Sequence, residues 1–166
     1  MQKMFYLFFS SLIFTSVLSQ SSSANDLHQT SAAAKAKSEM GDLCNRLSEI
    51  KRLPFKGESI DDEIYNQFLK QGKAAVPCLI NSITNTTKMR DPRSAPSYED
   101  FRVGDAAFFI LLKITNVPFE QMLPDQVKAR LKEEGVYAYF RYVEKTANRK
   151  ALQDRWKAWL KENPNI

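Results

Sequence analysis

Apolar side chains recur three and four residues apart along most of the chain beyond residue 38, a spacing that places them on one face of a helix. Each stretch with this spacing ends at a glycine, a proline or a polar run, as helices usually do. The stretch from Val103 to Ile114 is apolar nearly all round, so it is expected in the middle of the fold. The stretches expected to be helical are 40–53, 59–72, 74–83, 103–117, 124–135 and 148–163.

The stretch 136–143 fits either a helix or a strand. Val136, Tyr139, Phe140 and Val143 have helical spacing, although β-branched and aromatic residues also favour a strand. We expect a helix because the neighbouring stretches are helical and no strand pair with a hairpin signal is found in the sequence. The prediction is an all-α fold, a compact array of about six helices.

Polar residues at the starts of two of these stretches predict where the helices begin. Ser59 is expected to be an N-cap, with the acids at 61–63 in the first turn, where the helix dipole favours negative charge. Asn148 is expected to cap the last helix. Asp105 is expected to be another first-turn acid of this kind.

Two segments are candidates for binding a partner. The connection 84–102 is longer than compact domains normally contain, and loops of this length are often functional. The run 137–142 places aromatic rings beside basic residues, and tyrosine and arginine are favoured at interfaces, although half of these rings are expected in the core. The candidate binding residues are Arg90, Arg93, Tyr98, Tyr137, Arg141 and Tyr142.

Part of the chain resembles helical repeats. Ala75-Val76-Pro77-Cys78-Leu79-Ile80 resembles the second helix of a HEAT repeat, and Val103-Gly104-Asp105-Ala106-Ala107 resembles the first helix of the next repeat. Trp156-Lys157-Ala158-Trp159 is similar to helices that finish bacterial HEAT-like domains. The resemblance implies stacked helical pairs with a surface for protein partners. The connection 84–102 departs from it, being longer than a repeat normally allows, and no fixed period recurs.

The first residues have the three parts of a secretory signal. Lys3 supplies a positive start, an apolar run ends at Leu18, and small residues follow. We expect a signal peptide over 1–24, cleaved after Ser19 or Ala24; the alternative is an uncleaved membrane anchor. A mobile arm over 25–38 and a single helical domain over 39–166 would follow. The predicted location is outside the cytoplasm, in a bacterial periplasm or secreted.

Cys44 and Cys78 are the two cysteines of the chain. An even count in an exported chain favours a disulfide, and Cys78 points away from the apolar stripe of its own helix. Such a bridge would contribute on the order of 3–4 kcal/mol. Two free buried thiols are the alternative.

Few residues are suited to catalysis. His28 is the single histidine and lies in the expected arm, so no catalytic histidine, metal site or cofactor is expected. Two carboxylates across a cleft could cleave glycans, and the acidic clusters at 61–63 and 99–100 are the ones available. The formal net charge of +5 combines 24 basic with 19 acidic residues, a balance too even to indicate nucleic-acid binding.

The leading hypothesis is an exported, non-catalytic helical module that binds a protein partner, in a concrete form an immunity-type inhibitor of a toxin that acts on the cell envelope. The alternative is a carboxylate-dependent hydrolase acting on envelope glycans. A third possibility is a structural envelope protein attracted to anionic polymers by its basic surface. The sequence does not identify the partner.

Overall fold

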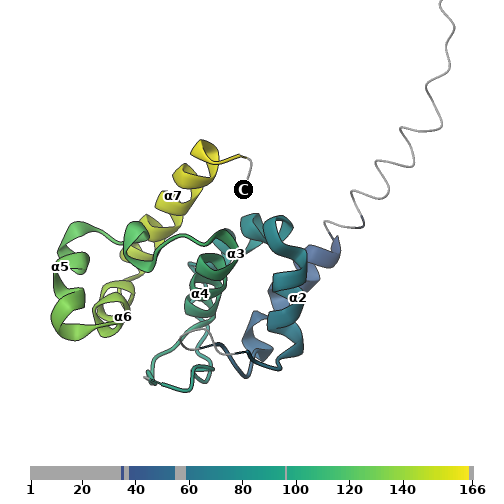
Figure 1. The fold of residues 1–166 in the computed structure, drawn as a ribbon, viewed down its shortest axis with the longest axis horizontal. Helices are drawn as coiled ribbons and strands as arrows, with labels where there is room; N and C mark the ends of the chain where they lie inside the picture. Colours follow the sequence, from purple (N-terminus) through teal and green to yellow (C-terminus); the bar gives the residue numbers. More distant parts are fainter. Residues whose placement is uncertain (1–34, 36–37, 55–58, 96, 165–166) are drawn as a thin grey trace, which may run out of the picture.

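The computed structural model describes residues 35, 38–54, 59–95 and 97–164. Over these residues the chain is all-α, as predicted, and the only β-pairing there consists of two isolated bridges. Residues 38–45 are helical and lead into the first 3₁₀ turn. The other elements are η1 (Arg46–Glu49), α2 (Glu63–Gln71), η2 (Gly72–Ala75), α3 (Val76–Ser82), α4 (Val103–Thr115), η3 (Phe119–Met122), α5 (Asp125–Glu134), α6 (Tyr137–Val143) and α7 (Thr146–Glu162) (Figure 1).

The predicted signal peptide lies outside the described residues, as does most of the predicted arm. Lys35 and Ser38 are helical, and Lys35 forms an exposed ion pair with Glu39 one turn later. Ser38, the last residue of the predicted arm, is therefore part of the first described helical segment.

Helix α4 lies in the middle of the fold, between the α2–α3 side and the α5–α7 side (Figure 1). It packs on α3 and also contacts α2 and η1. Ala106, Ala107, Phe108, Ile110 and Leu111 have no exposed surface, which confirms the central position expected from its apolar sequence. The α3–α4 pair carries the residues of the HEAT resemblance, while HEAT-like stacking stays a prediction.

A cluster of aromatic rings packs in the core between α4, α6 and α7. Phe108 stacks on Tyr139 at a centroid distance of 4.7 Å and meets Phe119 and Trp156 edge to face. Residues 137–143 form α6, so the helical interpretation of this stretch is confirmed. Its run of rings divides as expected, with Tyr139 and Phe140 fully buried.

Two helix starts differ from the prediction. Asp62, and not Ser59, caps α2: its carboxylate accepts the Tyr65 amide at 3.0 Å and also the Lys51 and Arg52 amides. A carboxylate has about four lone-pair sites and can accept all three amides, whereas a hydroxyl oxygen has two. Helix α7 starts at Thr146, ahead of Asn148, whose side-chain amide donates to the Tyr142 carbonyl at 2.7 Å instead.

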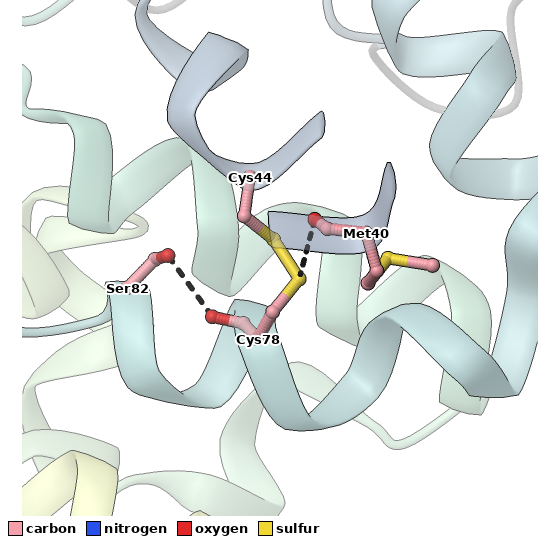
Figure 2. The surroundings of a disulfide bond; sticks show 4 residues. All are labelled: Met40, Cys44, Cys78 and Ser82. Atoms are coloured by element: carbon pink, nitrogen blue, oxygen red, sulfur yellow. Dashed lines mark hydrogen bonds between the residues drawn. A yellow bond between two sulfur atoms is a disulfide. The ribbon is translucent and has the colours of Figure 1, made fainter. Parts of the chain in front are cut away.

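The predicted disulfide between Cys44 and Cys78 is present and joins the helix over 38–45 to α3 (Figure 2). The two Cα atoms are 6.3 Å apart, within the range that a bridge spans. Cys78 Sγ lies 3.9 Å from the Met40 carbonyl oxygen, a packing contact, because a bridged sulfur has no hydrogen to donate. The Ser82 hydroxyl donates to the Cys78 carbonyl at 3.0 Å inside α3.

A buried polar network joins α4, α6 and α7. Arg149 forms an ion pair with Asp105 at 2.9 Å, and their side chains are 3% and 0% exposed. The Tyr139 hydroxyl donates to Asp105 at 2.9 Å, and burial, aided by the charge of Asp105, raises the pKa of Tyr139 well above its ordinary value. Burial lowers the pKa of Arg149, but Asp105 raises it more, so the net shift is upward. Asp105 also accepts the Arg102 amide, the first-turn role predicted for it.

Helix α7 also donates hydrogen bonds to the end of α3. The Gln153 side-chain amide donates to the Ile80 and Asn81 carbonyls at 3.1 and 3.0 Å. Arg149 reaches the Ile83 carbonyl at 3.5 Å. The last carbonyls of a helix have few partners within the helix, and these bonds from α7 give the end of α3 additional donors.

Gly104 allows the start of α4 to approach the end of α3. A β-carbon built at Gly104 would lie 2.2 Å from the Ile83 carbonyl oxygen and 2.9 Å from an Arg149 guanidinium nitrogen. We expect Gly104→Ala to lower the free energy of unfolding by about 1–3 kcal/mol, measured by urea denaturation, because the two helices must separate. Gly41→Ala is the matched control: no atom lies within 4 Å of its β-carbon, so this helical position should tolerate or favour alanine. Equal effects of the two changes would contradict this account.

Candidate binding surface

Asp91 organises the long connection between α3 and α4. Its carboxylate accepts the Arg93 amide at 3.0 Å, the Arg93 Nε at 2.9 Å and the Tyr98 amide at 2.8 Å. An aspartate directly before a proline commonly bonds to backbone amides that follow it in a turn. The carboxylate therefore fixes Tyr98, seven residues later, relative to the start of the turn.

Arg93 anchors this connection from inside the protein and is not available to a partner, contrary to the prediction. Its guanidinium carbon lies 4.6 Å from the ring centre of Phe140, 5.1 Å from Phe109 and 5.3 Å from Phe101. The residue is 9% exposed and is paired with Asp91, whose side chain is 5% exposed. Aromatic faces attract a cation, and the adjacent carboxylate neutralises it, so a charged group can be buried here.

Tyr98 connects the loop to α6. Its ring stacks on Phe140 with centroids 4.3 Å apart and planes inclined by 13°. Its hydroxyl donates to the Glu144 carboxylate at 2.7 Å. Burial and this hydrogen bond to a carboxylate raise the pKa of Tyr98 far above that of a free phenol, so the hydroxyl remains a donor at physiological pH.

Tyr137 lies beside Tyr98 and faces solvent. The two rings meet edge to face at 6.4 Å, and the Tyr137 hydroxyl donates to the Ser97 carbonyl at 3.3 Å. Tyr137 is 39% exposed, and among the described residues it is the one large hydrophobic side chain that is exposed. Arg141 follows one turn later on the same helical face and is paired with Glu134 at 2.9 Å. We call Tyr98, Tyr137, Arg141 and Glu144 the tyrosine surface.

Three of the six predicted binding residues therefore lie together, and the other three lie elsewhere. Tyr98, Tyr137 and Arg141 share the tyrosine surface, and Arg93 is buried beneath it. Tyr142 is half-buried on another side of α6, since a five-residue step turns about 140° around a helix. Burial raises the pKa of Tyr142, and the charge of Arg155 on α7 lowers it by a smaller amount. Arg90 is exposed and lies near Lys51 and Arg52 instead.

Asp91 and Glu144 support this surface but were not among the residues predicted from the sequence. The Asp91-Pro92 pair is a turn signal and could have identified the first. Glu144 shows no local signal, because its hydroxyl partner is 46 residues away in the sequence. Only the packing of the loop on α6 brings the two together.

Several of the acids considered for glycan cleavage have other partners. Asp100 pairs with Lys88 at 3.0 Å, and this hydrogen bond lowers the pKa of the Asp100 carboxyl. A general acid needs the opposite shift, towards the working pH. In the cluster at 61–63, Asp62 is the cap of α2 described above.

Within the described ranges, no group of three or more histidine, cysteine, aspartate or glutamate residues is arranged to hold a metal ion. His28 lies outside those ranges. Over the same residues, no helix has both the length and the apolar character needed to cross a bilayer. Comparisons with protein-family models, with curated proteins and with solved structures find no match to this chain.

Proposed function

We propose that this chain is an exported, non-catalytic helical module that binds a protein partner through the tyrosine surface. The observation that carries the proposal is the junction of Tyr98 and Tyr137 beside Arg141, because it joins two segments that were each predicted to bind. Tyrosine and arginine are the residue types that contribute most at protein interfaces. An exposed tyrosine beside an arginine therefore supports a contact site.

The rigidity of the surface supports the same function. The described residues of the connection 84–102 form no helix, yet Asp91, Arg93 and the Tyr98–Phe140 stack hold the connection on α6. Ordering a free loop on binding would cost about 0.5–1.5 kcal/mol for each side chain immobilised. A surface that is already ordered avoids this cost, so it can bind a partner more tightly for the same contact area.

The disulfide and the predicted signal peptide support a location outside the cytoplasm, since such bridges persist in oxidising compartments. A concrete form of the function is an immunity-type protein that blocks a toxin acting on the cell envelope. Small size, export and a helical surface suit this role. The resemblance to HEAT repeats favours binding over catalysis in the same way.

Affinity capture from the extracytoplasmic fraction of the source organism tests the proposal. We expect the wild-type protein to retain one partner in stoichiometric amount, and Tyr137→Ala with Arg141→Ala to retain at least about tenfold less, which is the loss of one hot-spot contact. The matched control is Tyr142→Ala with Arg155→Ala, which removes the same two residue types elsewhere. Tyr142 is the more buried tyrosine, so the control disturbs folding at least as much. Equal losses in both variants, or no stoichiometric partner for the wild type, would refute the proposal.

A further inference from the structure

A polar groove is lined by residues other than the four that form the tyrosine surface. It has a volume of about 760 Å³ and runs between η1, residues 50–52 and the first turn of α2. A smaller hollow of about 240 Å³ along residues 90–94 shares Lys51, Arg52 and Arg90 with it. We call the two hollows together the charged groove.

The backbone around the charged groove is held in place. Asp62 accepts the Lys51 and Arg52 amides at 2.9 and 3.1 Å, and the Leu53 amide donates to the Pro92 carbonyl at 2.9 Å. A parallel bridge pairs Leu53 with Arg93. The segment with Lys51 and Arg52 is thereby fixed between α2 and the segment that follows Arg90.

The three cations shared by the two hollows lack acidic partners. Lys51, Arg52 and Arg90 are exposed, and none of them forms an ion pair with a described carboxylate. Two acids that line these hollows have other partners, since Asp62 accepts backbone amides and Asp91 binds Arg93. The shared end of the groove is therefore positively charged.

The remaining wall has the opposite character. Residues that line only the larger hollow include Glu49, Asp61 and Glu63. Glu49 pairs with Arg46, and Glu63 accepts the Gln67 side-chain amide. The charged groove therefore has cations at its shared end and carboxylates along the remaining wall. A uniformly anionic polymer would meet repulsion at this second wall, whereas a chain with an acidic and a basic side chain would meet attraction at both.

We propose that the charged groove binds a mixed-charge peptide segment of a protein partner. Acidic side chains of the segment lie against Lys51, Arg52 and Arg90, and a basic side chain lies against Asp61 and Glu63. Arginine forks suit carboxylates because two parallel hydrogen bonds can form. This site uses residues separate from the tyrosine surface, so either proposal can fail without the other.

NMR titration of the oxidised protein with peptide pools tests the inference. The probes are capped hexapeptide pools that contain glutamate and lysine in all orders, glutamate alone with glycine, or serine and glycine alone, together with inorganic polyphosphate. We expect saturable shifts at the amides of residues 51, 52, 61 and 90 with the mixed pool. Lys51→Ala with Arg52→Ala should weaken this binding about tenfold.

The control variant, Lys132→Ala with Arg155→Ala, removes the same side chains from exposed positions on α5 and α7 and should leave the titration unchanged. Tyr137→Ala with Arg141→Ala should also leave it unchanged, which separates this site from the tyrosine surface. Tighter binding of the all-acidic pool would show that the acidic wall plays no part. Tighter binding of polyphosphate would assign the groove to a phosphate polymer, and no saturable shift with any probe would overturn the inference altogether.

Discussion

Arg149→Met is expected to lower the free energy of unfolding by about 3–5 kcal/mol, the usual effect of breaking a buried ion pair by removing one partner. Asp105 has no exposed surface, so the change leaves a carboxylate charge inside the protein with only the Tyr139 hydroxyl and the Arg102 amide to stabilise it. The bond to the Ile83 carbonyl is lost as well. Urea denaturation followed by circular dichroism measures the effect.

Two further variants show whether the stranded charge is the cause. Arg155→Met makes the same chemical change at an exposed position of α7 and should alter stability by no more than about 0.5 kcal/mol. Asp105→Asn combined with Arg149→Met removes both charges and should recover part of the loss, because a neutral amide costs less to bury than a carboxylate. If the double variant is no more stable than Arg149→Met alone, the loss comes from packing and not from the unpaired charge.

The helices could be predicted from the sequence because their signal is local. Apolar residues at helical spacing place α2, α4 and α7 within a few residues of their observed bounds. The helical interpretation of 137–143 depended on its neighbours, and the observed helix agrees. The disulfide could also be predicted, since two cysteines in a chain that is predicted to be exported leave one possible pairing.

The interpretation of charged residues was less successful because their partners are distant in sequence. Arg93 looked like a surface residue of a polar loop, but the fold places three aromatic rings from 101 to 140 around it. The partner of the buried Arg149, Asp105, lies 44 residues earlier in the sequence. A charged residue far from any local partner has no pattern to distinguish burial from exposure, so only the tertiary contacts decide.

Replacing both cysteines, as Cys44→Ser with Cys78→Ser, is expected to lower the free energy of unfolding by about 4 kcal/mol. The bridge closes a loop with a sequence separation of 34 residues, and the chain-entropy estimate for a loop of that length gives this value. Urea denaturation of the oxidised wild type and the variant measures the difference. The slope of the transition should also rise in the variant, because an unfolded chain without the cross-link exposes more surface.

The folded state should survive this loss, because the first segment has contacts of its own. Leu43, Leu47 and Ile50 are buried in the core, and η1 packs on α2 and α4. Reductant should therefore bring the wild type to the stability of the variant and leave the variant unchanged. Hydrogen exchange then locates the effect: an increase spread over the whole core agrees with a bridge that acts on the unfolded chain. An increase confined to 38–50, with the urea midpoint unchanged, would show instead that the bridge only fastens a segment that can detach while the remaining helices stay folded.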